Sequence, residues 1–192
     1  QGVSSAASDV YKRQVESFVK KTYKKVQRGD RSYRDTYKIT VSELERLVDM
    51  YKDCIDEDQT ARLIRDSIDH WIRRYHDYSI RGDIGAHYRQ VGIEQGDTVF
   101  EHVIPANEIR DMLIEGKLTV KQALNAPTCL IKKADDVKLR KSGLSASSPS
   151  RWQFFRRYLG LESVFTTYNG QNIDLDKWTL EDHYNLFNVE AE

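Results

Sequence analysis

The sequence has only two cysteines, Cys54 and Cys129, which lie far apart and in no spacing typical of metal ligands. A cysteine-rich zinc site is therefore excluded, and a disulfide framework like that of small secreted proteins is not expected. No apolar run approaches the roughly 20 residues that span a bilayer, and the N-terminus lacks the apolar centre of a signal peptide. These absences favour a reducing, cytoplasmic setting without membrane contact.

A net charge of one sign is also missing, because 30 Lys and Arg residues balance 30 Asp and Glu residues. Bulk charge thus indicates no particular partner, and any binding of nucleic acid has to come from local basic patches. The 192 residues are 39% hydrophobic and 31% charged. This composition is sufficient for a buried core under a solvated surface.

The first fourteen residues, QGVSSAASDVYKRQ, are treated apart from the rest. They resemble a peptide that recurs at the ends of unrelated metagenomic sequences, where translated sequencing adapter remains in the gene. Residues 1–14 are therefore interpreted as a non-native leader, and the fold is predicted from Val15 onward. Residues 15–90 form a predicted helical region, and residues 97–192 form a predicted α+β unit.

The front half has the apolar spacing of helices. One helix is predicted between Val15 and Gly29, and its lysines form either a basic arm for phosphates or a solvated face. Thr40 and Glu43 have the spacing of a capping box that opens the next helix. A longer helix is predicted from about Asp58. Its buried side is expected to consist of Ala61, Ile64, Ile68, Trp71, Ile72 and Tyr75.

The back half alternates between strand and helix patterns, after a glycine-rich, turn-like junction at residues 82–96. Strands are predicted at residues 98–104, 128–131 and 162–168. Helix starts are predicted at Asn107, Thr119, Ala134, Ser148 and Thr179, and the helix from Ser148 is expected to bury Trp152, Phe155, Tyr158 and Leu159. The predicted fold class is α+β and mainly helical. The N-terminal helices pack on a small unit of two or three strands, either as a separate region or in one compact domain.

Glu101 and His102 close the first predicted strand, immediately before Pro105. An imidazole at such a position takes a proton from water that attacks a phosphodiester, while a neighbouring carboxylate binds a divalent cation. Adjacent strand residues point to opposite faces, so both serve one site only where the strand ends or bulges. Pro105 is consistent with such an ending.

With Asn125 and Asp135–Asp136 downstream, Glu101 and His102 resemble the HNH, or ββα-metal, nucleases over about residues 99–144. In that family an Asp/Glu–His pair closes the first strand, an Asn lies in the connecting loop, and a helix after the second strand supplies the last ligand. The resemblance implies His102 as general base and Asn125 as a brace of the loop. It implies Glu101 with Asp135 or Asp136 as ligands of Mg²⁺ or Mn²⁺, with Zn²⁺ as the alternative.

The chain departs from the family in its carboxylates at the last ligand position and in its lack of zinc-knuckle cysteines. Each residue also has a structural alternative. His102 is then a half-buried strand residue, Asn125 caps or ends its helix, and Asp135–Asp136 complement a helix dipole. His183 is either a further ligand or a surface residue.

Basic residues around the final predicted helix favour nucleic acid as a partner, by phosphate contact and base stacking. The alternative is a solvated face. The predicted contact residues are Lys132, Lys133, Lys138, Arg140, Lys141, Arg156 and Arg157. The leading functional prediction is a divalent-metal-dependent DNA endonuclease of HNH type. The alternatives are a non-catalytic nucleic-acid-binding or phage accessory protein, and an interaction module with no nucleic-acid role. A general likeness to marine phage proteins favours a phage gene.

Overall fold

The computed structural model describes residues 37–94 and 96–189. The predicted leader at residues 1–14 and the predicted helix between Val15 and Gly29 lie outside this range. Among the described residues, no helix has both the length and the apolar character needed to cross a bilayer.

Two long helices form the N-terminal layer, α2 (Tyr37–Asp53) and α3 (Asp58–Tyr75). Each helix buries an apolar stripe with the spacing of one helix face. The buried residues are Leu44, Leu47 and Val48 on α2 and Ala61, Ile64, Ile68 and Ile72 on α3. The predicted long helix from Asp58 is therefore confirmed.

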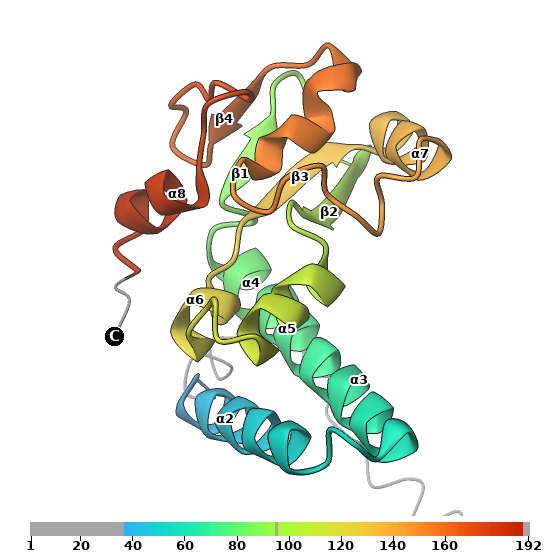
Figure 1. Cartoon of the computed structure of the whole chain (residues 1–192). Helices are drawn as coiled ribbons and strands as arrows, with labels where there is room; N and C mark the ends of the chain where they lie inside the picture. The colour runs from blue at the N-terminus through green and yellow to red at the C-terminus, as the bar shows by residue number, and fades with distance from the viewer. Residues whose placement is uncertain (1–36, 95, 190–192) are drawn as a thin grey trace, which may run out of the picture.

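The axis of α3 continues through a π-helical turn, η2 (His76–Ile80), into the short helix α4 (Arg81–Asp83). Single π turns of this kind occur frequently at functional sites. Figure 1 shows α3 running from the helical layer up to the sheet, so that its last turns lie beside the strands.

The capping box predicted at Thr40 and Glu43 is wrong. The helix α2 already includes Tyr37, and Thr40 lies inside it with 3% of its surface exposed. Because Thr40 is part of the helix, its hydroxyl does not face the free N–H groups that a cap satisfies. Glu43 instead forms an exposed ion pair with Arg46 at 2.8 Å.

A four-stranded mixed sheet forms the second layer, in the order β2-β3-β1-β4. Its strands are β1 (Tyr88–Gln90), β2 (Thr98–His102), β3 (Thr128–Lys132) and β4 (Phe165–Thr167). The β2–β3 and β1–β4 pairs are antiparallel, and the β1–β3 pair is parallel. The predicted α+β, mainly helical fold class is confirmed, with one strand more than the expected two or three.

That additional strand is β1, which lies inside the segment predicted to be a turn-rich junction. It is only three residues long and is flanked by Gly85 and Gly92, both with positive φ. Its residue Tyr88 is fully buried, and the strand pairs with two neighbours. The predicted helical region thus supplies an inner strand of the sheet, and one hydrophobic core extends from Leu44 to Val189.

The connecting helices are α5 (Ala106–Ile114), α6 (Val120–Leu124), α7 (Lys133–Lys141) and α8 (Leu180–Leu186). The predicted capping box at Thr119 and Gln122 is confirmed, and Thr179 caps α8 in the same way. Pro105, rather than the predicted Asn107, is the N-cap of α5. Figure 1 shows α5 and α6 with the N-terminal helices and α7 and α8 beside the sheet.

The helix predicted from Ser148 is instead a 3₁₀ helix, η3 (Phe154–Leu161). The tighter winding changes which residues face inward. Trp152 and Leu159, both predicted to be buried, are 55% and 48% exposed. The buried residues of η3 are Phe154, Phe155, Arg157, Tyr158 and Leu161.

Candidate functional site

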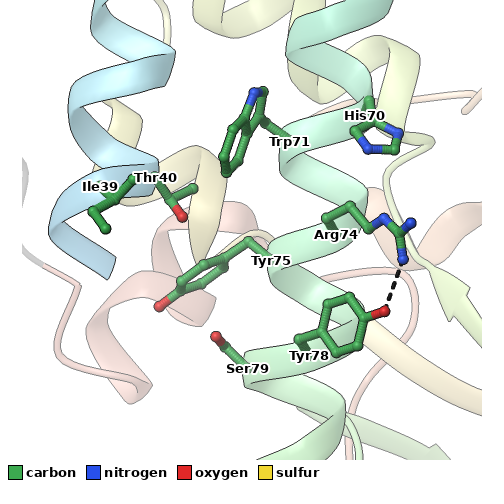
Figure 2. A pocket seen from close by; sticks show the side chains of 8 residues that line it. All are labelled: Ile39, Thr40, His70, Trp71, Arg74, Tyr75, Tyr78 and Ser79. Atoms are coloured by element: carbon green, nitrogen blue, oxygen red, sulfur yellow. Dashed lines mark hydrogen bonds between the residues drawn. The ribbon is translucent and has the colours of Figure 1, made fainter. Parts of the chain in front are cut away.

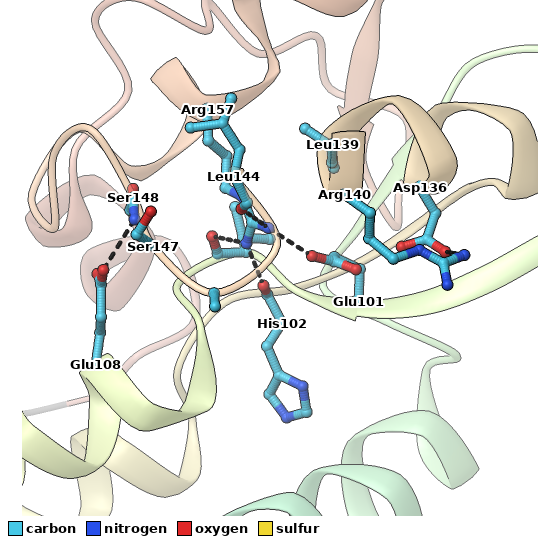
Figure 3. Close-up of polar contacts among 12 residues, drawn as sticks. Glu101, His102, Glu108, Asp136, Leu139, Arg140, Leu144, Ser147, Ser148 and Arg157 are labelled. Atoms are coloured by element: carbon cyan, nitrogen blue, oxygen red, sulfur yellow. Dashed lines mark hydrogen bonds and ion pairs between the residues drawn. The ribbon is translucent and has the colours of Figure 1, made fainter. Parts of the chain in front are cut away.

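Glu101 and His102 lie at the end of β2, as predicted, and their side chains leave the strand on opposite faces (Figure 3). Glu101 points toward α7 and η3, whereas His102 points toward α3. This divergence is the normal alternation of a regular strand. Neither a bulge nor an early strand end brings the two side chains together, because the β2–β3 register is unbroken through the pair His102 and Thr128.

The carboxylate of Glu101 is held by Arg157, with an N–O distance of 2.8 Å. Burial raises the pKa of Glu101, and the positive charge of Arg157 opposes that shift. The guanidinium of Arg157 also donates hydrogen bonds to three backbone carbonyl oxygens. These belong to His102, Val103 and Leu144.

The predicted contact of Arg157 with nucleic acid requires a surface position, but Arg157 is buried. Its side chain is 0% exposed, so no phosphate reaches it in this structure. The physical reason is the 3₁₀ winding of η3, which turns Arg157 inward and leaves its neighbour Arg156 outside.

Asp135 and Asp136 begin α7, as predicted, but their carboxylates have different partners. Asp136 pairs with Arg140 at 2.5 Å and lies on the Glu101 side of the sheet (Figure 3). Asp135 accepts hydrogen bonds from Gln90 at 2.6 Å and pairs with Lys138 at 2.7 Å. Burial alone raises the pKa of Asp135, but the bonds from Lys138 and Gln90 outweigh burial, and the net pKa is lowered.

Asn125 ends α6 and lies next to α8 rather than beside His102. Its side-chain amide donates to the carbonyl of Lys121 at 2.8 Å, and its own carbonyl accepts a hydrogen bond from His183 at 2.7 Å. His183 is fully buried and also bonds to the hydroxyl of Tyr88, so the expected surface position of His183 is wrong. Burial lowers the pKa of His183 to about 4.

The imidazole of His102 lies 5.0 Å from that of His76, measured between ring centroids. Burial, together with nearby positive charge, lowers the pKa of His102 well below its ordinary value. Its Nε2 atom is buried and has no hydrogen-bond partner among the described residues.

The structure thus brings Glu101 and Asp136 to one face and places His102 and Asn125 elsewhere. Each of the two carboxylates on the shared face is paired with an arginine. Within residues 37–94 and 96–189, no group of three or more His, Cys, Asp or Glu side chains is arranged to hold a metal ion.

Most of the other predicted nucleic-acid contacts are engaged locally. Lys138 and Arg140 pair with the aspartates of α7, and Arg156 pairs with Asp176 at 2.9 Å. Lys133 donates to the carbonyl of Gly96. Lys141 is exposed and Lys132 is half-buried.

A different surface combines aromatic rings with positive charge. We call it the aromatic groove, a hollow of about 370 Å³ between α2 and the end of α3. Trp71, Tyr75 and Tyr78 all line the hollow; Trp71 and Tyr75 project toward α2, and the Tyr78 ring lies beside Arg74 on the other side of the helix (Figure 2). It is completed by Ile39, Thr40, His70, Arg74 and Ser79.

Arg74 carries the charge of the aromatic groove. Its guanidinium donates to the Tyr78 hydroxyl at 2.8 Å and lies 5.5 Å from the centre of that ring. In the described part of the chain, Arg74 forms no ion pair, so a neutral hydroxyl is its partner and its charge is not neutralised.

Two further hollows adjoin the aromatic groove and share residues with it. One, of about 300 Å³, shares His70 and Arg74 and extends to Phe100 and His102 on β2. The other, of about 370 Å³, shares Tyr75 and Ser79 and extends to Asn125 and Phe187. The three hollows together follow α3 and η2, so two residues of the predicted nuclease site, His102 and Asn125, line this surface at its two ends.

Sequence reasoning assigned Trp71 and Tyr75 to the buried side of α3, and so missed the groove. The isoleucines at 64, 68 and 72 form the fully buried stripe, while Trp71 and Tyr75 lie beside it and remain half-buried. The available signal was the close spacing of Trp71, Tyr75 and Tyr78, with Arg73 and Arg74 between them and His70 before them. In a regular α-helix that spacing places three rings on one face, and the π turn η2, which contains Tyr78, departs from that regular spacing.

No protein-family model, curated protein or solved structure matches this chain. The geometry of the surface therefore carries the functional argument by itself.

Proposed function

We propose that this protein binds single-stranded nucleic acid without cleaving it, and that the strand lies along the aromatic groove. The observation that supports the proposal is the combination of Trp71, Tyr75 and Tyr78 with the unneutralised charge of Arg74. Aromatic rings stack on bases of any sequence, and nearby cations contact the backbone. A duplex is a poorer fit, because its bases are already stacked on one another.

The rings also follow one another along the chain. The series Trp71, Tyr75 and Tyr78 lies on a helical segment that rises about 1.5 Å per residue, so it covers roughly 10 Å. The adjoining hollows extend the surface at both ends. An extended polymer fits such a surface better than a single compact ligand.

Fluorescence anisotropy with labelled oligonucleotides tests the proposal, using single-stranded DNA, single-stranded RNA and duplex DNA at several salt concentrations. We expect the single strands to bind, with an affinity that falls as salt rises, because bound cations displace counterions from phosphates. An affinity independent of salt, or a preference for duplex, contradicts the proposal.

Substitutions in the groove localise the binding. Tyr78→Ala removes a stacking interaction of about 1–3 kcal/mol, which corresponds to roughly 5- to 150-fold weaker binding. Tyr78→Phe keeps the ring and serves as the matched control with nearly unchanged affinity. Trp152→Ala removes an exposed tryptophan outside the groove and is expected to leave binding unchanged.

A metal-dependent HNH endonuclease is the second candidate, because one observation favours it. Strands β2 and β3 are antiparallel and α7 directly follows β3, which is the strand–strand–helix order expected from the resemblance. Glu101 and Asp136 also share a face. A cation there takes the place of the two arginines that now bind these carboxylates.

Plasmid nicking separates the two candidates. The nuclease predicts cleavage in Mg²⁺ or Mn²⁺ that disappears in His102→Ala and Glu101→Gln. A binding protein retains single strands in Glu101→Gln, and neither metal converts supercoiled plasmid to the nicked form.

A further inference from the structure

The second hollow lies between α3 and β2 and has a composition unlike that of the aromatic groove. It is lined by His70, Arg73, Arg74, Asp77, Phe100 and His102, and its volume is about 300 Å³. Four of these six side chains are arginines or histidines, and one is an acid. Because it shares His70 and Arg74 with the aromatic groove, a group in this hollow lies directly beside a group stacked in the groove.

His102 gives the hollow an unsatisfied polar atom. Phe100 and His102 project from the same face of β2, as alternate strand residues do, and their ring centroids are 5.8 Å apart. The Nε2 atom of His102 is buried without a hydrogen-bond partner in the described part of the chain. A buried polar atom left unpaired is unfavourable, so a ligand that pairs with it is favoured.

The charges around the hollow favour an anion. Arg73 pairs with Asp69 at 2.5 Å, and Arg81 pairs with Asp77 at 2.9 Å. Among residues 37–94 and 96–189, Arg74 pairs with the Tyr78 hydroxyl and with no carboxylate. Within that range Arg73, Arg74 and Arg81 therefore exceed Asp69 and Asp77 by one charge, next to the unpaired imidazole nitrogen.

We infer that this hollow is a phosphate site, in which Arg73 and Arg74 bind phosphate oxygens and His102 donates from Nε2. This inference rests on the proposed function, since the bound phosphate belongs to the strand whose bases stack in the aromatic groove. A guanidinium and a ring N–H are both suitable donors to phosphate oxygens. The shared wall of His70 and Arg74 matches the adjacency of base and phosphate within one nucleotide.

Inorganic phosphate is the direct probe, titrated into the full chain at constant ionic strength against a chloride reference. The NMR signals of the His70 and His102 imidazoles report on the hollow and are assigned with His70→Gln and His102→Gln. We expect both signals to shift saturably with phosphate and not with chloride. Shifts equal to those in chloride overturn the inference.

Two substitutions at one position test the role of the nitrogen. His102→Phe keeps a ring but removes the donor, and we expect phosphate to bind at least about tenfold more weakly, as followed at His70. His102→Gln keeps a donor and retains binding. Equal affinity in His102→Phe and the wild type overturns the inference, provided that thermal melts show the variant is folded. Lys141→Gln, on an exposed lysine of α7, is the matched control.

Oligonucleotide binding separates failure of the inference from failure of the proposed function. One outcome is that single-stranded oligonucleotides bind and Tyr78→Ala weakens them, while phosphate shifts neither histidine signal. That outcome contradicts the phosphate site and leaves the proposed function intact. Saturable phosphate binding without any binding of single strands contradicts the proposed function and leaves an anion site. Competition between phosphate and single strands supports both.

Discussion

Arg157 is a buried charged residue with a structural role. It neutralises Glu101 and satisfies three backbone carbonyls in a place that excludes water. We expect Arg157→Met to lower the free energy of unfolding by about 3–5 kcal/mol, because Glu101 then remains as a buried, unpaired charge. Urea denaturation followed by circular dichroism measures the change.

Arg156 is the matched control, since it is adjacent in sequence and its ion pair with Asp176 is exposed. Arg156→Met is expected to change stability by less than about 1 kcal/mol. The double variant Arg157→Met with Glu101→Gln is expected to recover part of the loss, because the unpaired charge is gone. Equal effects of the two arginine substitutions contradict the proposed role of Arg157.

Sequence patterns located these residues better than they assigned their roles. The strand end at Glu101 and His102, and the acidic first turn at Asp135 and Asp136, are where the sequence predicts them. The partners of these side chains were not predictable, because Arg157 and Gln90 come from distant parts of the chain. Local spacing contains no information on such contacts.

At the scale of elements, two similar sequence signals have different outcomes. Thr119 and Gln122 form a capping box at the start of α6, with both reciprocal hydrogen bonds present. Thr40 and Glu43 have the same spacing but lie inside α2. We expect Thr119→Ala to destabilise the protein by about 1 kcal/mol, whereas Glu43→Ala changes stability by less than about 0.5 kcal/mol.

Thermal unfolding of the two variants provides the comparison, with Thr119→Ser as a control that retains the oxygen of the cap. If Glu43→Ala lowers stability as much as Thr119→Ala does, the assignment of Thr119 as a helix cap and of Thr40 as an interior helix residue is contradicted. The comparison shows that the four-residue pattern predicts a helix start only where the first residue lies outside the helix.

Elements with long periodic patterns were predictable, and short ones were not. The stripe on α3 spans several turns, so its helix was predicted from spacing alone. Strand β1 has three residues, too few for alternation to be recognised, and its glycine-rich surroundings indicate turns. The 3₁₀ helix η3 was predicted as an α-helix because both begin from similar sequences, although they bury different residues.

At the scale of the whole molecule, the proposed binding surface depends on how layers meet. The aromatic groove requires α2 to lie beside the end of α3, and the phosphate site requires β2 to approach the same helix from the sheet. The sequence predicted both layers and their packing together, but not which residues meet. His70, Arg73 and Arg74 therefore had no predicted relationship to Phe100 and His102, although all five line one hollow.

Three of the five histidines are buried and His102 is half-buried, which makes the whole fold sensitive to acid. Burial lowers the pKa of His76 and His183 to about 4 and that of His87 and His102 well below the ordinary value of 6.5. Between pH 6.5 and 4 the unfolded chain binds more protons than the folded chain, so stability falls as the pH falls. Each histidine with a pKa near 4 contributes a slope of up to about 1.4 kcal/mol per pH unit.

Between pH 6.5 and 4, the contributions of His76 and His183 to the free energy of unfolding are each expected to fall by about 3 kcal/mol. Each contribution is fully present above pH 6.5. Denaturation curves at pH 7.5, 6.5, 5.5 and 4.5 measure the slope. His76→Gln keeps a donor for the Ala123 carbonyl and removes the titrating group, so its slope becomes shallower than that of the wild type. A slope that is the same in His76→Gln and in the wild type contradicts the burial of His76 as a neutral imidazole.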